Sequence, residues 1–164
     1  LPVREYPDID PGPGALLTIM SPDQLIAQLR KNLAAVPGIK GVNNHMGSKL
    51  TRQSSQMYQI FSVLKQQGLF FVDSRSAPHT QGRSSARLFR LPFAERDVFL
   101  DHRPDPEFIR AQIKNLIEIA RKNGEAIAIA HPHKTTYRVL KETLPDLKTQ
   151  VDLVPISTLV HVFG

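Results

Sequence analysis

Short apolar runs alternate with longer segments of helical periodicity along this sequence, and this alternation is its strongest constraint on the fold. An apolar run of about four to eight residues suits a strand buried on both faces, whereas apolar residues three or four apart suit a helix packed on one side. The runs predict strands at 39–43, 69–72, 98–100, 126–130 and 151–156. The order β-α-β-α-β-α-β-α-β favours an α/β fold with a parallel sheet or barrel covered by helices.

The predicted helices begin and end at residues with known terminal preferences. Ser21 followed by Pro22 predicts the start of a helix that continues to about residue 36. Thr51 predicts the N-cap of a second helix, which continues to about residue 67. The remaining helices are predicted at 83–91, at 106–123, and from Thr135 or Thr136 to 147 with Pro145 restricting its end, and residues 1–14 are predicted as loop.

The composition is that of an ordinary folded chain, and we predict a single domain over residues 1–164. The absence of cysteine excludes disulfides, thiolate-bound metals and thiol nucleophiles. No apolar run approaches the roughly 18 residues of a membrane span, so no transmembrane segment is predicted. The net charge is +6, but basic residues are not interleaved with aromatic ones, and we predict no nucleic-acid partner. The sequence also lacks a phosphate-binding loop and a Gly-x-Ser-x-Gly motif.

Polar side chains of catalytic types follow four of the predicted strands. In parallel α/β folds such loops meet at one edge of the sheet or one rim of the barrel. Neutral imidazoles and carboxylates suit zinc, which can supply a hydroxide for hydrolysis. Each residue also has a structural interpretation, because an aspartate can cap its own loop and an arginine can form an ion pair. The residues are Asn43, Asn44, His45 and Ser48 after the first strand, Asp73, Ser74 and Arg75 after the second, Arg96 and Asp101 around the third, and His131 and His133 after the fourth.

Four segments resemble the divergent polysaccharide deacetylase family in their order and spacing. The most specific is Asn43-Asn44-His45-Met46-Gly47-Ser48, followed by Thr51. The other segments are 71–76, 96–101 and 126–133, and the resemblance extends from about residue 11 to residue 157. It implies a distorted (β/α) barrel related to carbohydrate esterases. Those enzymes remove N- or O-acetyl groups from polysaccharides with a divalent metal, usually zinc.

The resemblance also implies roles for the histidines. His45 is similar to a metal ligand of the family. His131 follows Ile129 and Ala130 in a segment that resembles the late Leu-x-His motif of the wider superfamily, which implies that His131 is the catalytic acid. His133 lies beside it and is predicted as a second metal ligand. The implied cofactor is a divalent metal, with zinc favoured.

Further polar residues are assigned supporting roles on the same basis. Arg75 or Arg96 would orient a carboxylate, and Asp73 or Asp101 would support the catalytic site. The predicted substrate-binding residues are Asn43, Asn44, Ser48 and Ser74. The implied substrate is an acetylated polysaccharide or peptidoglycan-like glycan, and the implied location is the periplasm or cell envelope.

The sequence departs from the family at its beginning. The family's first strand normally ends in an acidic pair that supplies the base and a metal ligand, and a histidine normally precedes a Leu-Pro-Met segment. Leu1-Pro2-Val3 resembles the position just after that histidine. We therefore expect the C-terminal portion of a hydrolase domain that acts on C–N or ester bonds.

An incomplete domain has physical consequences. We expect an incomplete barrel whose open sheet edge favours self-association, weak metal binding, and no deacetylase activity by this chain alone. The alternative is a non-catalytic protein that binds glycan or assists assembly in the envelope and retains the deacetylase fold.

Overall fold

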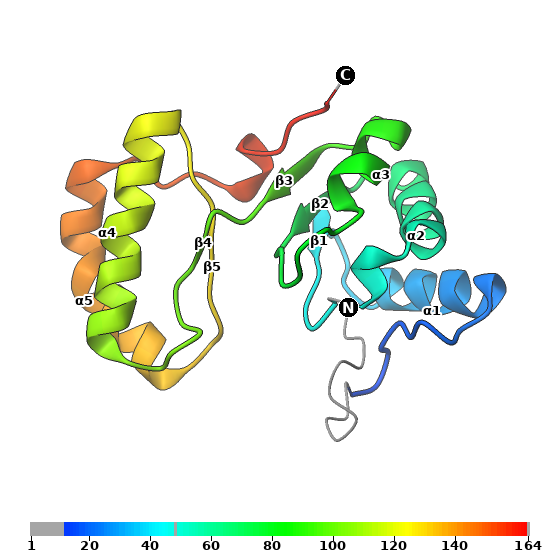
Figure 1. The fold of residues 1–164 in the computed structure, drawn as a ribbon, viewed down its shortest axis with the longest axis horizontal. Helices are drawn as coiled ribbons and strands as arrows, with labels where there is room; N and C mark the ends of the chain where they lie inside the picture. The colour runs from blue at the N-terminus through cyan, green and yellow to red at the C-terminus, as the bar shows by residue number, and fades with distance from the viewer. Residues whose placement is uncertain (1–11, 48, 164) are drawn as a thin grey trace. The chain divides into compact units, whose positions relative to one another are not determined.

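The computed structural model describes residues 12–47 and 49–163 (Figure 1). These residues form two compact units, one within Leu1–Glu95 together with Val160–Gly164, and one within Arg96–Leu159. We call them the first and the second unit and describe each by itself. Most of the predicted loop at 1–14, and Ser48, lie outside the described residues.

The first unit contains a parallel sheet in the order β1-β2-β3. Its register aligns Val42 with Phe71, and Phe71 in turn with Phe93. Helix α2 packs between α1 and α3, and an antiparallel bridge joins Phe93 to His161 (Figure 1). The elements are α1 (Pro22–Ala34), β1 (Gly41–Asn43), η1 (Leu50–Arg52), α2 (Ser54–Gln66), β2 (Phe70–Asp73), α3 (Gly82–Phe89) and β3 (Phe93–Glu95).

The core of the first unit is built around three fully buried phenylalanines. The ring centroids of Phe61 and Phe71 are 4.9 Å apart, and the rings of Phe71 and Phe93 are stacked at 6.2 Å. Such aromatic pairs contribute packing beyond the burial of their apolar area. The apolar face predicted for the first helix is confirmed, because Leu25, Leu29 and Leu33 join this core.

The second unit contains two helices beside a pair of short parallel strands, β4 and β5 (Figure 1). Helices α4 and α5 pack on one another, and their apolar faces form a core with Val98 and Leu100. The Asp105 side chain caps α4 by accepting the Phe108 N–H at 2.7 Å, and Gly124 ends that helix with φ of 86°. The elements are β4 (Val98–Phe99), α4 (Pro106–Asn123), β5 (Ala128–Ile129), α5 (Lys134–Gln150) and η2 (Ile156–Thr158).

Two aspartates extend the short pairing of β4 with β5. At one end Asp97 Oδ2 accepts the Ile127 N–H at 2.8 Å, and at the other Asp101 Oδ2 accepts the His131 N–H, also at 2.8 Å. A carboxylate makes a strong, charge-assisted acceptor for a backbone N–H. The side chains of Asp97 and Asp101 thus fix the register of two strands that have few ladder bonds of their own.

The structure confirms parallel α/β architecture and differs from the local predictions at four points. The segment 151–156 is not a strand, because it has no partner strand among the described residues and is mostly exposed. The sequence prediction missed β3, and α5 continues through Pro145 to Gln150. Thr51 lies in η1 and does not cap α2, whose N-cap is Gln53. Closure of the strands into a barrel, and a single domain, stay predictions.

None of the helices in the described part of the chain has the length and apolar character needed to cross a membrane.

Candidate functional site

The loops that follow β1 and β2 are joined by two buried hydrogen bonds, both donated by Ser74 and accepted by Asn44. The Ser74 N–H donates to Oδ1 of Asn44 at 2.7 Å, and the Ser74 hydroxyl donates to the Asn44 carbonyl at 2.6 Å. Nδ2 of Asn43 donates to the Val72 carbonyl at 2.7 Å. These bonds involve three of the four predicted substrate-binding residues, of which Asn44 and Ser74 are bonded to each other. Their contact with substrate stays a prediction, and Ser48 lies outside the described residues.

The hydrogen bonds also determine how the Asn44 amide is turned. Because Oδ1 must face the Ser74 N–H, Nδ2 is the remaining donor. This buried Nδ2 has no acceptor among the described residues. Asn44 is therefore held by one end of its amide only.

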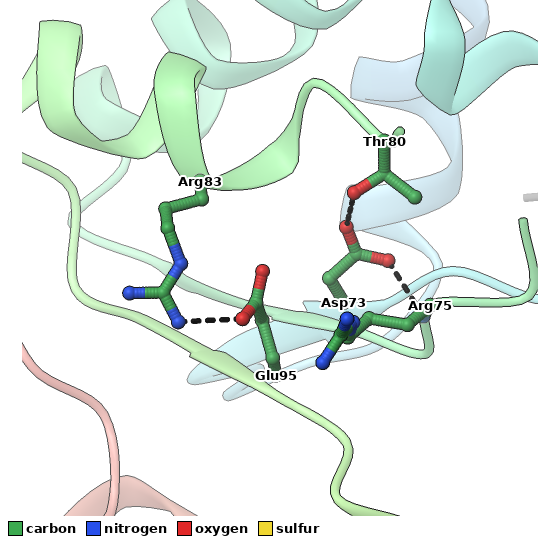
Figure 2. A network of polar contacts seen from close by, with 5 residues as sticks. All are labelled: Asp73, Arg75, Thr80, Arg83 and Glu95. Carbon is green, nitrogen blue, oxygen red and sulfur yellow. Dashed lines mark hydrogen bonds and ion pairs between the residues drawn. The ribbon is translucent and has the colours of Figure 1, made fainter. Parts of the chain in front are cut away.

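Asp73 is the last residue of β2, and its carboxylate closes the loop that follows (Figure 2). Oδ1 accepts the Arg75 N–H at 2.8 Å, and Oδ2 accepts the Thr80 hydroxyl at 2.6 Å. A Cβ added at Gly82 would overlap Oδ2, so the start of α3 approaches the carboxylate closely. Asp73 is fully buried, which fits its interpretation as a loop cap. A direct role for Asp73 in catalysis stays a prediction.

Arg83 and Glu95 form an ion pair beside this loop, which the sequence prediction missed (Figure 2). Nη2 of Arg83 lies 2.5 Å from Oε2 of Glu95. The hydrogen bond to Glu95 raises the pKa of the Arg83 guanidinium, and partial burial opposes this effect. Since Glu95 pairs with Asp73 in the sheet register, the ion pair links α3 to the same strand ends. Arg75 itself is exposed and adopts a positive φ of 46°.

His45 follows β1 directly, and its side chain is exposed. Imidazole is a common zinc ligand, and exposure leaves it accessible to a metal ion. In the part of the chain that the structure describes, His45 does not belong to a group of three metal-ligating side chains. Its assignment as a ligand stays a prediction.

In the second unit, three donors converge on the buried carboxylate of Asp101. Oδ2 accepts the His131 N–H and the Thr136 hydroxyl, each at 2.8 Å. Oδ1 lies 3.2 Å from Nδ1 of His131, whose side chain is 33% exposed whereas that of Asp101 is 0% exposed. An ionised carboxylate accepts only, so Nδ1 carries the proton in this pair. The arrangement orients the imidazole and assigns any further proton transfer to Nε2.

The same imidazole belongs to a group that could hold a metal. One ligand atom each from Asp101, His131 and His133 lies within 4.8 Å of the others. Two imidazoles and a carboxylate suit zinc chemically. Coordination through Nδ1 of His131 would replace its hydrogen bond to Asp101, however. Proton donation and metal binding are therefore alternative uses of His131.

Arg96 contacts an aromatic side chain of β4, and its role in orienting a carboxylate stays a prediction. Its guanidinium lies 5.2 Å from the ring centroid of Phe99, and Phe99 contacts His131 edge-to-face at 5.1 Å. The sequence pattern predicts Phe99 only as a strand residue and gives no sign of its contacts with Arg96 and His131. Thr136 was predicted only as a helix opener, although its buried hydroxyl holds Asp101.

Parallel strands and a carboxylate–imidazole pair at their carboxyl ends define an α/β chain with a candidate acid–base or metal site. The family model described as divergent polysaccharide deacetylase matches residues 1–160. The chain belongs to this family.

Two curated relatives and one solved structure show how far the similarity extends. The chain is 37% identical over 142 residues to Escherichia coli K12 protein YibQ, a match covering 87% of this chain and 44% of YibQ. It is 35% identical over 119 residues to a Haemophilus influenzae Rd protein, covering 73% and 42%. A crystal structure from Agrobacterium tumefaciens C58 matches with a TM-score of 0.91 at 25% identity, covering 97% of this chain and 66% of that one. All three carry the description "uncharacterized".

The chain spans less than half the length of the curated relatives it matches.

Proposed function

We propose that this chain supplies the proton-donating part of a metal-dependent polysaccharide deacetylase. The observation that carries the proposal is the Asp101–His131 pair at the carboxyl ends of β4 and β5, with Nδ1 3.2 Å from Oδ1. Family membership supports an acetylated polysaccharide as the substrate class.

The proposed roles follow from the hydrogen bonds. Asp101 fixes the Nδ1–H tautomer of His131 and stabilises the imidazolium that donates from Nε2. When an acetamide is hydrolysed, water adds to the acetyl carbon, the C–N bond breaks, and acetate and an amine form. The amine nitrogen leaves only as it gains a proton, which His131 would deliver. Thr136 keeps the Asp101 carboxylate turned toward the imidazole.

A divalent metal, with zinc favoured, would supply polarisation of the acetyl carbonyl and acidification of water. Among the residues of this chain we propose His45 as a ligand, on the family resemblance and on its exposed imidazole at a strand end. Asp101, His131 and His133 form the competing assignment, because their donor types also fit. We favour His45, since the Asp101 oxygens already accept three hydrogen bonds from protein donors.

The architecture of the whole domain and its location in the cell are further proposals, and they rest on family membership. We propose that this chain is part of a longer form whose length matches that of the curated relatives, that its strands contribute there to a distorted (β/α) barrel, and that the protein acts in the periplasm or cell envelope. Self-association of the isolated chain would follow from an open sheet edge.

The test is acetate release from N-acetylated chitin oligosaccharides by the longer form of the protein, with zinc and after chelation. The proposal predicts release that requires the metal. Binding of the oligosaccharide without any acetate release in either condition would instead establish the second candidate, a non-catalytic glycan-binding protein. That candidate is favoured by the exposed basic helix face described next.

A further inference from the structure

One exposed face of α5 carries four cations and a tyrosine and no carboxylate. At 100° per residue, its members fall within an arc of about 100°. All five side chains are exposed, and that of Tyr137 is 69% exposed. We call this set the α5 basic face; its residues are Lys134, Tyr137, Arg138, Lys141 and Lys148.

The two carboxylates of α5 lie off this face and are already engaged. Glu142 pairs with Arg110 of α4 at 2.6 Å, and Asp146 accepts from Nε2 of Gln150 at 2.8 Å. Within the described residues, no ion pair joins a cation of the α5 basic face to a carboxylate. A merely solvated face usually mixes both charge signs, as the exposed side of α4 does with Lys114 and Glu118.

The face is also not needed for packing within the second unit. The opposite side of α5 buries Thr136, Val139 and Leu147 against the core. A 69% exposed tyrosine contributes little to folding, whereas it offers a flat ring with an apolar surface and a polar tip to a ligand.

The α5 basic face begins at the strand end that carries the Asp101–His131 pair. His133 is the N-cap of α5, and the Tyr137 N–H donates to its carbonyl at 2.9 Å. From Lys134 the face runs about 21 Å along the helix, at 1.5 Å per residue. The positive end of the helix dipole is at the same end as the pair. A linear polymer bound on this face could extend from the Asp101–His131 pair over several of its monomers.

We propose that the α5 basic face binds an acidic polysaccharide, with its carboxylates on the lysines and Arg138 and the apolar side of one sugar ring on Tyr137. The proposal rests on the proposed function, whose substrate class it narrows to a glycan that carries carboxylates. Single-stranded nucleic acid would require several stacking aromatics, and a membrane surface would require apolar side chains flanking the cations. The face has one aromatic ring, and one exposed aliphatic side chain, Leu144, lies beside it, whereas Val139 and Leu147 of α5 are buried. A single flanking leucine does not form the apolar row that insertion into a membrane surface requires.

The test compares hyaluronan oligosaccharides with neutral chitin oligosaccharides of equal length, by calorimetry on this chain. Hyaluronan should bind more tightly, and its affinity should fall as NaCl rises from about 50 to about 300 mM, because salt screens exposed charges. Lys141→Gln combined with Lys148→Gln should lower the affinity about fivefold. The matched control on α4, Lys114→Gln combined with Lys122→Gln, should leave the affinity unchanged.

Tyr137 is tested separately with a conservative variant. Tyr137→Phe keeps the ring and should retain hyaluronan binding, whereas Tyr137→Ala should weaken it. Three results would each overturn the proposal. The first is equal affinity for chitin and hyaluronan, and the second is an equal loss of affinity in the α4 control. The third is binding of single-stranded DNA or anionic phospholipid vesicles that the α5 variants weaken, in the absence of hyaluronan binding. Hyaluronan binding needs no acetate release, so absent deacetylation with intact binding contradicts the proposed function alone.

Discussion

Asp101 holds His131 at two points, accepting its backbone N–H at 2.8 Å through Oδ2 and lying 3.2 Å from its Nδ1 through Oδ1. One carboxylate thereby fixes both the main chain and the ring of the same histidine. Thr136 donates to Oδ2 from the first turn of α5, so three segments meet at a single buried group. The orientation of His131 is therefore a property of the folded second unit.

Replacing Asp101 with alanine should destabilise the protein. The change leaves the His131 N–H and the Thr136 hydroxyl without their acceptor in a buried site, at a cost of about 2–4 kcal/mol. Asp101→Asn keeps one oxygen acceptor and should cost less. Urea unfolding followed by circular dichroism measures both. Equal stability of Asp101→Ala and the unmodified protein would show that these hydrogen bonds do not support the fold.

Thr136→Val removes one donor to Asp101 at nearly constant volume. It should lower the free energy of unfolding by about 1 kcal/mol, because one acceptor position of the carboxylate loses its partner. Thr136→Ser keeps the hydroxyl and serves as the control. The same urea titration distinguishes them, and a valine variant no less stable than the serine variant would contradict the assigned role.

Gly82→Ala should destabilise the first unit. The new Cβ would overlap Oδ2 of Asp73, so either the carboxylate or the start of α3 must move. Overpacking of this kind costs about 1–3 kcal/mol. Ser84→Ala, at an exposed position of the same helix, should change the stability by no more than about 0.5 kcal/mol. A Gly82→Ala variant as stable as this control would show that the carboxylate adjusts freely.

Asp97→Ala should loosen the start of the β4–β5 pair. Its Oδ2 accepts the Ile127 N–H at 2.8 Å, and losing a charge-assisted bond to the backbone costs about 1.5–3 kcal/mol. Asp97→Asn retains an oxygen acceptor and should lose less. The rate of amide hydrogen exchange at Ile127 measures the loss of this hydrogen bond directly, and it should rise in the alanine variant. Unchanged protection in the alanine variant would contradict it.

Zinc titration of the longer form distinguishes the two ligand assignments. We predict that His45→Ala weakens zinc binding at least about tenfold and that His133→Ala changes it much less. His102→Ala is the control for loss of an exposed imidazole. The reverse pattern would place the metal on Asp101, His131 and His133, and His131 would then no longer be the proton donor.

Local signals were enough to predict most helices. The sequence places α4 at 106–123, as observed, because Pro106 and the Asn123-Gly124 pair mark its ends through short-range backbone effects. The same reasoning fails for β3, whose Phe93–Glu95 has no apolar run and becomes a strand by pairing with β2. The apolar residues of 151–156 lack such a partner among the described residues and form no strand.

The residues of the candidate site could be predicted from the sequence, but their spatial arrangement could be predicted only in part. Family resemblance selected Asp101 and His131 as separate residues, but their contact spans 30 positions of sequence and depends on the register of β4 with β5. The burial of Asp73 behind Thr80 and Gly82 is likewise a consequence of packing. No local sequence pattern predicts that the Thr136 hydroxyl points toward Asp101 and donates to its carboxylate.

In the proposed mechanism His131, oriented by Asp101, protonates the leaving amine. The most direct measurement compares His131→Ala with the unmodified longer form on two substrates, an N-acetylated chitin oligosaccharide and 4-nitrophenyl acetate. Nitrophenolate leaves without a proton, whereas the glycan amine requires one. We expect kcat for the oligosaccharide to fall about 100-fold or more, whereas kcat for ester hydrolysis should change far less. An equal loss on both substrates, or no loss on the oligosaccharide, would contradict this mechanism.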